Sequence, residues 1–183
     1  MSDHDRVRWD TRYAEQDPLS VDDVDLPKVF LPLAALFPTA GHAVDLACGR
    51  GAASVWLARR GLTVQGYDIS SVAIAQAAGL AEKCGVGDRC RFTTADLDDG
   101  LPPGPPAKTM ICNRFRCPAL DTSILGRLAP GGILAISALS EVGAAPGPFR
   151  VPAGELTRVF AELTVLAAGE AHGEAWLLAR RPH

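Results

Sequence analysis

Short apolar runs alternate with longer amphipathic segments from residue 43 to the C-terminus. Such runs, about four to eight residues long between turn signals, are typical of buried strands, and they cover residues 43–47, 62–67, 90–95, 108–113 and 132–137. Apolar residues at helical spacing predict helices near 52–60, 70–84 and 119–128. Strands that alternate with helices in this way predict an α/β domain with a mainly parallel sheet and right-handed crossovers.

The two ends of the chain add smaller elements. Residues 4–15 and about 28–36 predict two helices, joined by an exposed acidic connection. Residues 154–160 predict a short last helix, followed by a closing pair of strands near 163–168 and 175–179. The connection between the third and fourth strands is too rich in proline for a helix, so we expect no covering helix there.

A turn rich in small residues follows the first predicted strand. Asp45 lies near the end of that strand, and Gly49 and Gly51 lack the Cβ atoms that would block a close approach to the backbone. The second strand also ends in an acid, Asp68, where a carboxylate can accept hydrogen bonds from both hydroxyls of a ribose. These two strands and the helix between them predict a site for a nucleoside cofactor.

The glycine spacing bears on which nucleoside cofactor binds. A dinucleotide site needs G-x-G-x-x-G, in which bare backbone meets a pyrophosphate at the start of a helix. If the pattern is aligned to begin at residue 47, its three glycine positions are occupied by Ala47, Gly49 and Ala52. If it is aligned to begin at residue 49, they are occupied by Gly49, Gly51 and Ser54. The chain also lacks a Tyr-x-x-x-Lys proton relay. A nicotinamide-dependent oxidoreductase is therefore the less favoured alternative.

An acid two residues before a small residue and then G-x-G resembles the first motif of the class I S-adenosylmethionine-dependent methyltransferases, although Ala47 replaces the family's usual first glycine. The resemblance implies a Rossmann-like methyltransferase fold, with a single doubly wound, mainly parallel, seven-stranded sheet whose last strand is antiparallel. It implies S-adenosyl-L-methionine as the cofactor. The turn that contains Cys48 would then contact the methionine half, and Asp68 with Ile69 would hold the ribose.

Two later segments carry the same resemblance. Residues 91–97 resemble the family's third strand, which implies that Ala95, Asp96 and Leu97 lie beside the adenine. The fourth strand of the family leads to the catalytic edge of the sheet, where this chain has Asn113. We therefore expect all four residues to belong to the cofactor site.

The ends of the chain resemble a narrower group, the small bacterial tellurite-resistance and thiopurine methyltransferases, which act on small molecules. The resemblance lies in a W-x-x-R-Y opening and in residues 152–156 and 174–181, and it adds Trp9, Arg12 and Tyr13 to the expected cofactor contacts. Trp9 and Tyr13 share a helical face, a spacing that is also typical of core packing. An aromatic face over a sulfonium gains about 0.5 to 2 kcal/mol.

This resemblance and the exposed acidic connection suggest a division of the chain. We expect residues 1–183 to form a single methyltransferase domain, in which residues 1–40 are a helical lid or cap and residues 41–183 are the cofactor-binding core. A parallel sheet leaves its ligand crevice open at the carboxyl ends of the strands, where such a lid would close.

No residue is singled out as catalytic. The sequence after the fourth strand lacks an Asn-Pro-Pro-Tyr signature, and no general base is evident, so we expect a small-molecule acceptor that is already nucleophilic at sulfur, oxygen or nitrogen. Arg114 and Arg116 could hold an anionic group of that acceptor by paired hydrogen bonds, or lie in solvent. A protein that binds S-adenosylmethionine without transferring its methyl group is the main alternative.

The composition of the chain restricts the kinds of partner that it is expected to bind. A net charge of −3 with scattered arginines disfavours nucleic acid. No apolar run approaches the ~20 residues that span a bilayer, and no signal-peptide core follows the polar N-terminus. The five cysteines lack a C-x-x-C pair, which predicts neither a disulfide framework nor a metal site. We expect a cytoplasmic bacterial enzyme without a membrane partner, and the sequence leaves its oligomeric state open.

Overall fold

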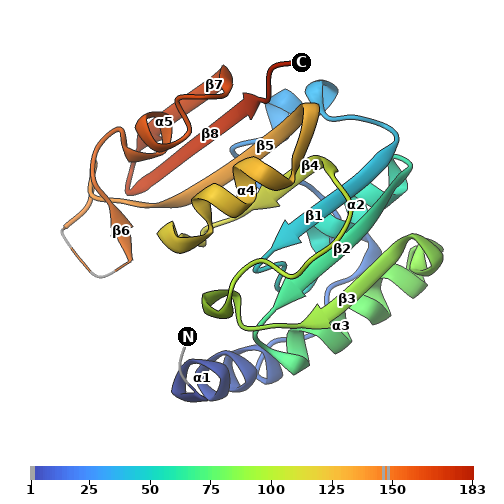
Figure 1. Ribbon diagram of the computed structural model, residues 1–183. Coiled ribbons are helices and arrows are strands. Elements are labelled where there is room, and N and C mark those ends of the chain that lie inside the picture. The colour runs from blue at the N-terminus through green and yellow to red at the C-terminus, as the bar shows by residue number, and fades with distance from the viewer. Residues whose placement is uncertain (1–2, 146, 148) are drawn as a thin grey trace.

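The computed structural model describes residues 3–145, 147 and 149–183, which form a sheet flanked by helices (Figure 1). Seven strands follow one another across the sheet in the order β3-β2-β1-β4-β5-β8-β7, and the short β6 pairs with β5 outside this path. The strands are β1 (Gly41–Leu46), β2 (Leu62–Asp68), β3 (Cys90–Thr94), β4 (Ala107–Cys112), β5 (Leu128–Ser140), β6 (Arg150–Val151), β7 (Thr164–Ala171) and β8 (Glu174–Arg180).

The strand directions confirm the expected doubly wound sheet. β1 pairs in parallel with β2 and β4, and β3 and β5 extend the parallel part on either side. β8 runs antiparallel to both β5 and β7, as the expected antiparallel last strand requires. The chain order reverses between β1 and β4, and ligands of open α/β sheets bind in the crevice at the carboxyl ends of the strands around such a point.

Helices cover both faces of the sheet (Figure 1). They are α1 (Asp3–Ala14), α2 (Ala52–Arg59), α3 (Ser71–Lys83), α4 (Asp121–Arg127) and α5 (Glu155–Val159). Short 3-10 segments connect them: η1 (Val21–Asp23), η2 (Leu31–Leu36), η3 (Gly87–Arg89), η4 (Leu97–Asp99) and η5 (Pro118–Leu120). The five α-helices lie close to the positions predicted for residues 4–15, 52–60, 70–84, 119–128 and 154–160.

The period of two along the strands divides the core between the faces. On β4, Met110 packs toward α4 and α5, whereas the next residue, Ile111, packs toward α2 and the segment that contains Phe30. Both residues are fully buried. The central strands are therefore buried on both faces, which explains why they appear in the sequence as nearly continuous apolar runs.

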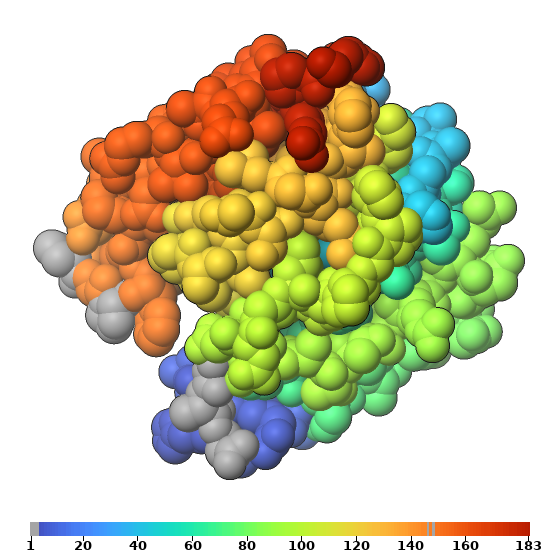
Figure 2. All heavy atoms as spheres, viewed as in Figure 1, coloured from blue at the N-terminus to red at the C-terminus, as the bar shows by residue number. Residues whose placement is uncertain are grey.

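The connection between β3 and β4 contains the single 3-10 turn η4 and no α-helix, and all of its residues are described. This result confirms the expectation drawn from its prolines. Figure 2 shows that the side chains of this connection lie against α4 on the same face of the molecule. Arg127 of α4 donates hydrogen bonds to the carbonyl oxygens of Pro102 and Pro105. Side-chain contacts thus replace a covering helix.

Two predicted elements need correction. Residues 28–36 do not form an α-helix, because Pro32 lacks an amide donor and the segment bonds with 3-10 spacing, as in the contact from Leu33 N–H to the Phe30 carbonyl at 2.9 Å. The fifth strand covers residues 128–140 rather than 132–137, because its start pairs with Ala107 of β4 and its end continues along β8 and β6.

Among the helices of the described residues, none combines the length and the apolar character needed to cross a bilayer.

Candidate functional site

Two adjoining cavities open at the carboxyl ends of β1, β2 and β4. The larger has a volume of about 640 Å³ and the smaller about 180 Å³. Both are lined by Trp9, Tyr13, Asn113 and Arg114, so the two cavities meet between α1 and the end of β4. The larger one is in the size range of small-molecule sites, roughly 300 to 1,000 Å³.

The turn after β1 follows a left-handed path that its small residues permit. Ala47, Gly49 and Gly51 have φ values of 53°, 53° and 83°. A Cβ atom on Gly51 would lie 2.7 Å from the Cβ atom of Ala77 on α3, so only glycine fits there without displacing the helix. This close packing places the turn at the floor of the cavities.

Asp45 is buried beneath this turn and lines the larger cavity. It is 2% exposed, and the hydroxyl of Ser54 on α2 donates a 2.6 Å hydrogen bond to its Oδ2 atom. Burial raises the pKa of Asp45 from 3.8 to about 7, with the Ser54 hydrogen bond acting in the opposite direction. A cation in the larger cavity would stabilise the ionised form of this carboxyl group.

Asp68 ends β2 at the wall of the smaller cavity. Its Oδ2 atom accepts a hydrogen bond from the amide of Gly49 and its Oδ1 atom from the amide of Ser70, both at 2.9 Å. Burial raises its pKa, although these amide donors oppose the shift. The carboxylate therefore links the turn after β1 to the start of α3, and each oxygen keeps capacity to accept a further hydrogen bond.

The helix α1 is attached to the core beside Asp68. The Oδ1 atom of Asp10 accepts hydrogen bonds from the Ser70 hydroxyl at 2.6 Å and from the Val72 amide at 3.3 Å. Farther along the helix, the Gln76 side chain donates to the Tyr13 carbonyl oxygen at 3.1 Å. These contacts hold α1 against the N-terminal part of α3, as Figure 1 shows.

The aromatic pair of α1 faces the turn after β1. The rings of Trp9 and Tyr13 are stacked with 5.7 Å between their centroids, and the Arg12 guanidinium lies 5.2 Å from the Trp9 ring. The Tyr13 hydroxyl lies directly over Gly49, 3.0 Å from where a Cβ atom would stand. Burial raises the pKa of Tyr13 well above its usual range, so this hydroxyl is protonated and can donate.

The structure brings most of the predicted cofactor residues to the cavities. Those that line one or both are Trp9, Arg12, Tyr13, Asp45, Ala47, Cys48, Gly51, Asp68, Ile69, Leu97 and Asn113. Gly49, Ala95 and Asp96 do not line them. Gly49 and Ala95 instead donate amide hydrogen bonds to Asp68, and Asp96 accepts from the Asp98 amide at the start of η4.

Within the described residues, no group of three or more metal-ligating side chains is placed to hold a metal ion.

Comparisons with known proteins agree with this geometry. A family model described as a methyltransferase domain matches residues 43–132, which contain the turn and both acids. The chain belongs to the class I S-adenosylmethionine-dependent methyltransferases. S-adenosyl-L-methionine is accordingly the cofactor of this methyltransferase.

Solved structures with similar folds support the assignment. A structure described by the conversion of a disulfide bond into a thioacetal group during echinomycin biosynthesis has a TM-score of 0.69 and 24% identity, covering 97% of this chain and 93% of that one. TehB from Haemophilus influenzae has a TM-score of 0.70 and 19% identity, covering 96% of this chain and 66% of that one. Magnesium protoporphyrin IX methyltransferase from Synechocystis, with bound SAH, has a TM-score of 0.67 and 20% identity, covering 97% of this chain and 93% of that one. At these identities the likeness shows the fold.

One curated sequence matches over a short stretch. The ribosomal RNA small subunit methyltransferase C of Alcanivorax borkumensis is 53% identical over 34 residues, which are 19% of this chain and 10% of the relative. The methyltransferase therefore matches about a tenth of the length of this relative, and its acceptor does not follow from the match. The narrower resemblance to tellurite-resistance and thiopurine methyltransferases stays a prediction.

Sequence reasoning missed several residues that shape the site. Asp10 and Gln76 act through contacts between segments that are distant in the sequence, and Ser54 acts on Asp45 across the turn from β1 to α2; none of the three carries a local signal. Ser70 could have been found, because a serine between a strand-end acid and an amphipathic segment is typical of a helix N-cap, and its hydroxyl accepts from the Ala73 amide at 3.1 Å.

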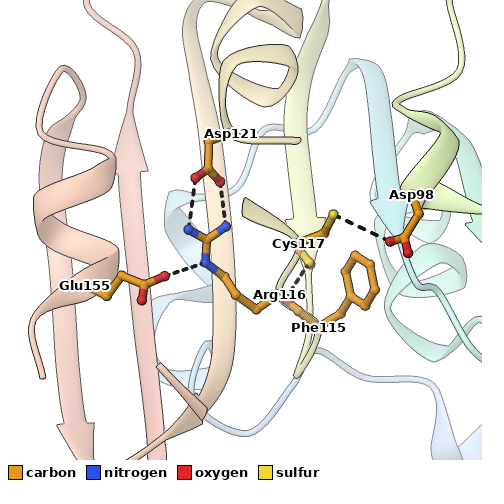
Figure 3. A network of polar contacts seen from close by, with 7 residues as sticks. Asp98, Phe115, Arg116, Cys117, Asp121 and Glu155 are labelled. Carbon is orange, nitrogen blue, oxygen red and sulfur yellow. Dashed lines mark hydrogen bonds and ion pairs between the residues drawn. The ribbon is translucent and has the colours of Figure 1, made fainter. Parts of the chain in front are cut away.

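Arg116 has a structural environment that excludes it from the acceptor site. Its Nη1 and Nη2 atoms donate to the two oxygens of Asp121 at 2.6 and 2.9 Å, and its Nε atom donates to Glu155 at 2.8 Å (Figure 3). Its side chain is 7% exposed. The guanidinium therefore joins the segment after β4 to α4 and α5, and it holds no acceptor.

Proposed function

We propose that this methyltransferase transfers the methyl group of S-adenosylmethionine to a small-molecule nucleophile at sulfur, oxygen or nitrogen. The observation that carries the proposal is the meeting of two cavities at one set of side chains. The smaller cavity contains the strand-end acid Asp68, and the larger extends past Asn113 to Glu174. One cavity thus suits the nucleoside, and the other has room for the methionine portion and an acceptor.

The residues present fit this cofactor. Asp68 keeps hydrogen-bonding capacity at the smaller cavity, as a ribose ligand requires. Asp45 is a buried acid whose only hydrogen bond among the described side chains comes from Ser54, and it faces the larger cavity, where an ammonium group would stabilise it. When bound, S-adenosylmethionine supplies an electrophilic methyl group on a positively charged sulfur.

The chain's own residues contribute mainly position and exclusion of water. The stacked rings of Trp9 and Tyr13 line both cavities, where they can limit water and offer aromatic surface to a cation. Orientation of this kind supplies up to about 7 to 11 kcal/mol of barrier reduction in favourable intramolecular reactions. The proposal therefore requires no catalytic acid or base.

The charges around the larger cavity favour a small molecule over nucleic acid. Asp23, Asp25 and Glu174 line it together with cationic residues, so the opening offers no continuous basic surface to a phosphate backbone. The overall charge of −3 has the same consequence. These features support a compact acceptor.

The same proposal covers the division of the chain. Residues 1–183 would act as one domain, in which residues 1–40 form a lid over the core of residues 41–183. The contacts of Asp10 and Tyr13 with α3 give this lid a defined docking position beside the cavities.

Calorimetry and a transfer assay test the proposal. We expect saturable binding of S-adenosylmethionine and S-adenosylhomocysteine without saturable binding of NAD or NADP. Radiolabelled methyl transfer is then measured to panels of small thiols, phenols, carboxylates and amines, and to ribosomal RNA. Binding without transfer to any acceptor would support the non-catalytic alternative, transfer to RNA alone would refute the small-molecule acceptor, and nucleotide specificity for NAD or NADP would refute the cofactor.

A further inference from the structure

Arg114 follows β4 at the place where the two cavities meet, and its backbone is strained. Its φ is 55°, in the left-handed region that residues other than glycine rarely adopt. Among the described residues the others of this kind are Ala47, Phe149 and His172, and of these only Ala47, in the turn after β1, also lines a cavity. Strain of this kind persists at functional sites where the surroundings impose it.

A hydrogen-bond chain imposes this conformation. The Arg114 amide donates to the hydroxyl of Ser137 on β5 at 3.0 Å, and that hydroxyl donates to the Asn113 side-chain oxygen at 2.8 Å. Ser137 is fully buried, so the chain is anchored in the sheet. The backbone of Arg114 is therefore held by two neighbouring strands, and the start of its side chain has a defined direction.

The guanidinium of Arg114 is only partly engaged. Its Nε atom lies 3.5 Å from Oε1 of Glu174, at the start of β8, and no other ion pair or hydrogen bond of the guanidinium occurs among the described residues. Its side chain is 61% exposed at the cavity mouth. Arg116, two residues later, has all three guanidinium nitrogens bonded to acids. Arg114 thus retains the paired terminal N–H groups that Arg116 has committed to the fold.

The ion pair directs Arg114 away from the cofactor residues. The sheet order places β4, β5 and β8 on the side of β1 opposite to β2. Because Glu174 belongs to β8, its attraction draws the guanidinium away from the turn after β1 and from Asp68. The larger cavity extends in this direction and includes Glu174 in its lining.

We infer that Arg114 selects a methyl acceptor that carries a carboxylate, which it holds by two parallel hydrogen bonds from its terminal nitrogens. This inference rests on the proposed function and adds the substrate class to it. A planar monoanion matches the free edge of one guanidinium. A dianionic phosphate is disfavoured, because Glu174 lies 3.5 Å from the Arg114 guanidinium and would repel the second charge.

The test compares matched probes that differ only in the anionic group. Each pair has the same nucleophile: 2-mercaptobenzoate with 2-mercaptobenzamide, 4-hydroxybenzoate with 4-hydroxybenzamide, and 4-aminobenzoate with 4-aminobenzamide. The measured quantity is the ratio of kcat/KM for the carboxylate to that for the amide. We expect the protein to favour the carboxylate about tenfold or more in at least one pair, as charge-assisted hydrogen bonds imply.

Two variants isolate the contribution of Arg114. In Arg114→Gln the ratio should fall toward one, while the dissociation constant of S-adenosylhomocysteine changes less than about threefold. Arg59→Gln removes the same charge from an exposed position on α2, outside both cavities, and should keep the ratio of the unmodified protein. A ratio near one in the unmodified protein, an unchanged ratio in Arg114→Gln, or a large loss of S-adenosylhomocysteine affinity would each overturn the inference.

Binding decides the question if none of these probes is methylated. Calorimetry with benzoate and benzamide, with and without S-adenosylhomocysteine, should show tighter binding of benzoate that disappears in Arg114→Gln. Equal binding of the two compounds overturns the inference about Arg114. Failure of the protein to bind S-adenosylhomocysteine at all is a separate outcome, which refutes the proposed function.

Discussion

The buried acid Asp45 should make the stability of this methyltransferase depend on pH in a characteristic direction. Burial raises its pKa from 3.8 to about 7, so between these values the folded protein keeps a proton that the unfolded chain releases. The free energy of unfolding contributed by this group therefore falls as the pH rises through that window, and it is constant above about pH 7. At about 1.4 kcal/mol per pH unit, the full change amounts to roughly 4 kcal/mol.

Asp45→Asn removes this titration and keeps the shape of the side chain. The amide oxygen can still accept the Ser54 hydrogen bond, but the new NH₂ group is buried without an obvious acceptor, at a cost of about 1 to 2 kcal/mol. We therefore expect the variant to be slightly less stable than the unmodified protein near pH 4. Near pH 8 it should be more stable by about 2 to 3 kcal/mol, because only the unmodified protein then has a buried carboxylate at position 45, whereas Asp68 is common to both proteins.

Urea denaturation at pH values from 4 to 8.5 measures this difference. The decisive quantity is how the difference in unfolding free energy between Asp45→Asn and the unmodified protein changes with pH. The other titrating groups are common to both proteins, so their contributions cancel in this difference. Asp25→Asn, which changes an exposed acid on the same cavity, is the control and should run parallel to the unmodified protein. Parallel curves for Asp45→Asn would refute the reasoning, because they would show that Asp45 titrates at the same pH when folded and unfolded.

Three further predictions concern the proposed cofactor site and the proposed lid. Asp68→Ala should weaken S-adenosylhomocysteine binding by about 2 to 4 kcal/mol, or roughly 30- to 1000-fold in the calorimetric dissociation constant, because two ribose hydrogen bonds are lost. Gly51→Ala should reduce the unfolding free energy by about 2 to 4 kcal/mol, since its Cβ atom would overlap Ala77 in a left-handed backbone. Residues 3–20 should exchange amide hydrogens rapidly in the free protein and become protected by S-adenosylhomocysteine, and deletion of residues 1–20 should weaken binding.

Each of these has a matched control. Asp88→Ala, at an exposed position, should leave the dissociation constant unchanged. Gly85 has a φ of 68° and open space around its Cβ position, so Gly85→Ala measures the strain alone and should cost less than Gly51→Ala. Equal costs would contradict the overlap with Ala77. For the lid, unchanged protection with ligand together with unfolding of the truncated protein would show that α1 is part of the core.

Local pattern was sufficient to predict the fold class of this methyltransferase. Strands that are buried on both faces appear as apolar runs, and the amphipathic segments between them have the period of a helix, so element type and order could be predicted from neighbouring residues alone. The same was true of Gly51 and Asp68, because the turn and the strand end that they occupy are short, local structures. Their spacing disfavoured a dinucleotide, and the resemblance of the motif to that of class I methyltransferases implied S-adenosylmethionine as the cofactor.

Tertiary structure decided what the individual polar residues do. Arg114 and Arg116 have equivalent places in the sequence, yet Arg116 is enclosed by acids from α4 and α5, whereas Arg114 lies exposed at the mouth of a cavity with most of its guanidinium free. Asp45 has a raised pKa mainly because the folded structure buries it, and the charge of Asp68 on the neighbouring strand adds to the shift. Asp10 bonds to Ser70, sixty positions away. Hydrophobic periodicity depends on near neighbours, whereas solvation and charge pairing depend on which distant segments the packed sheet brings together.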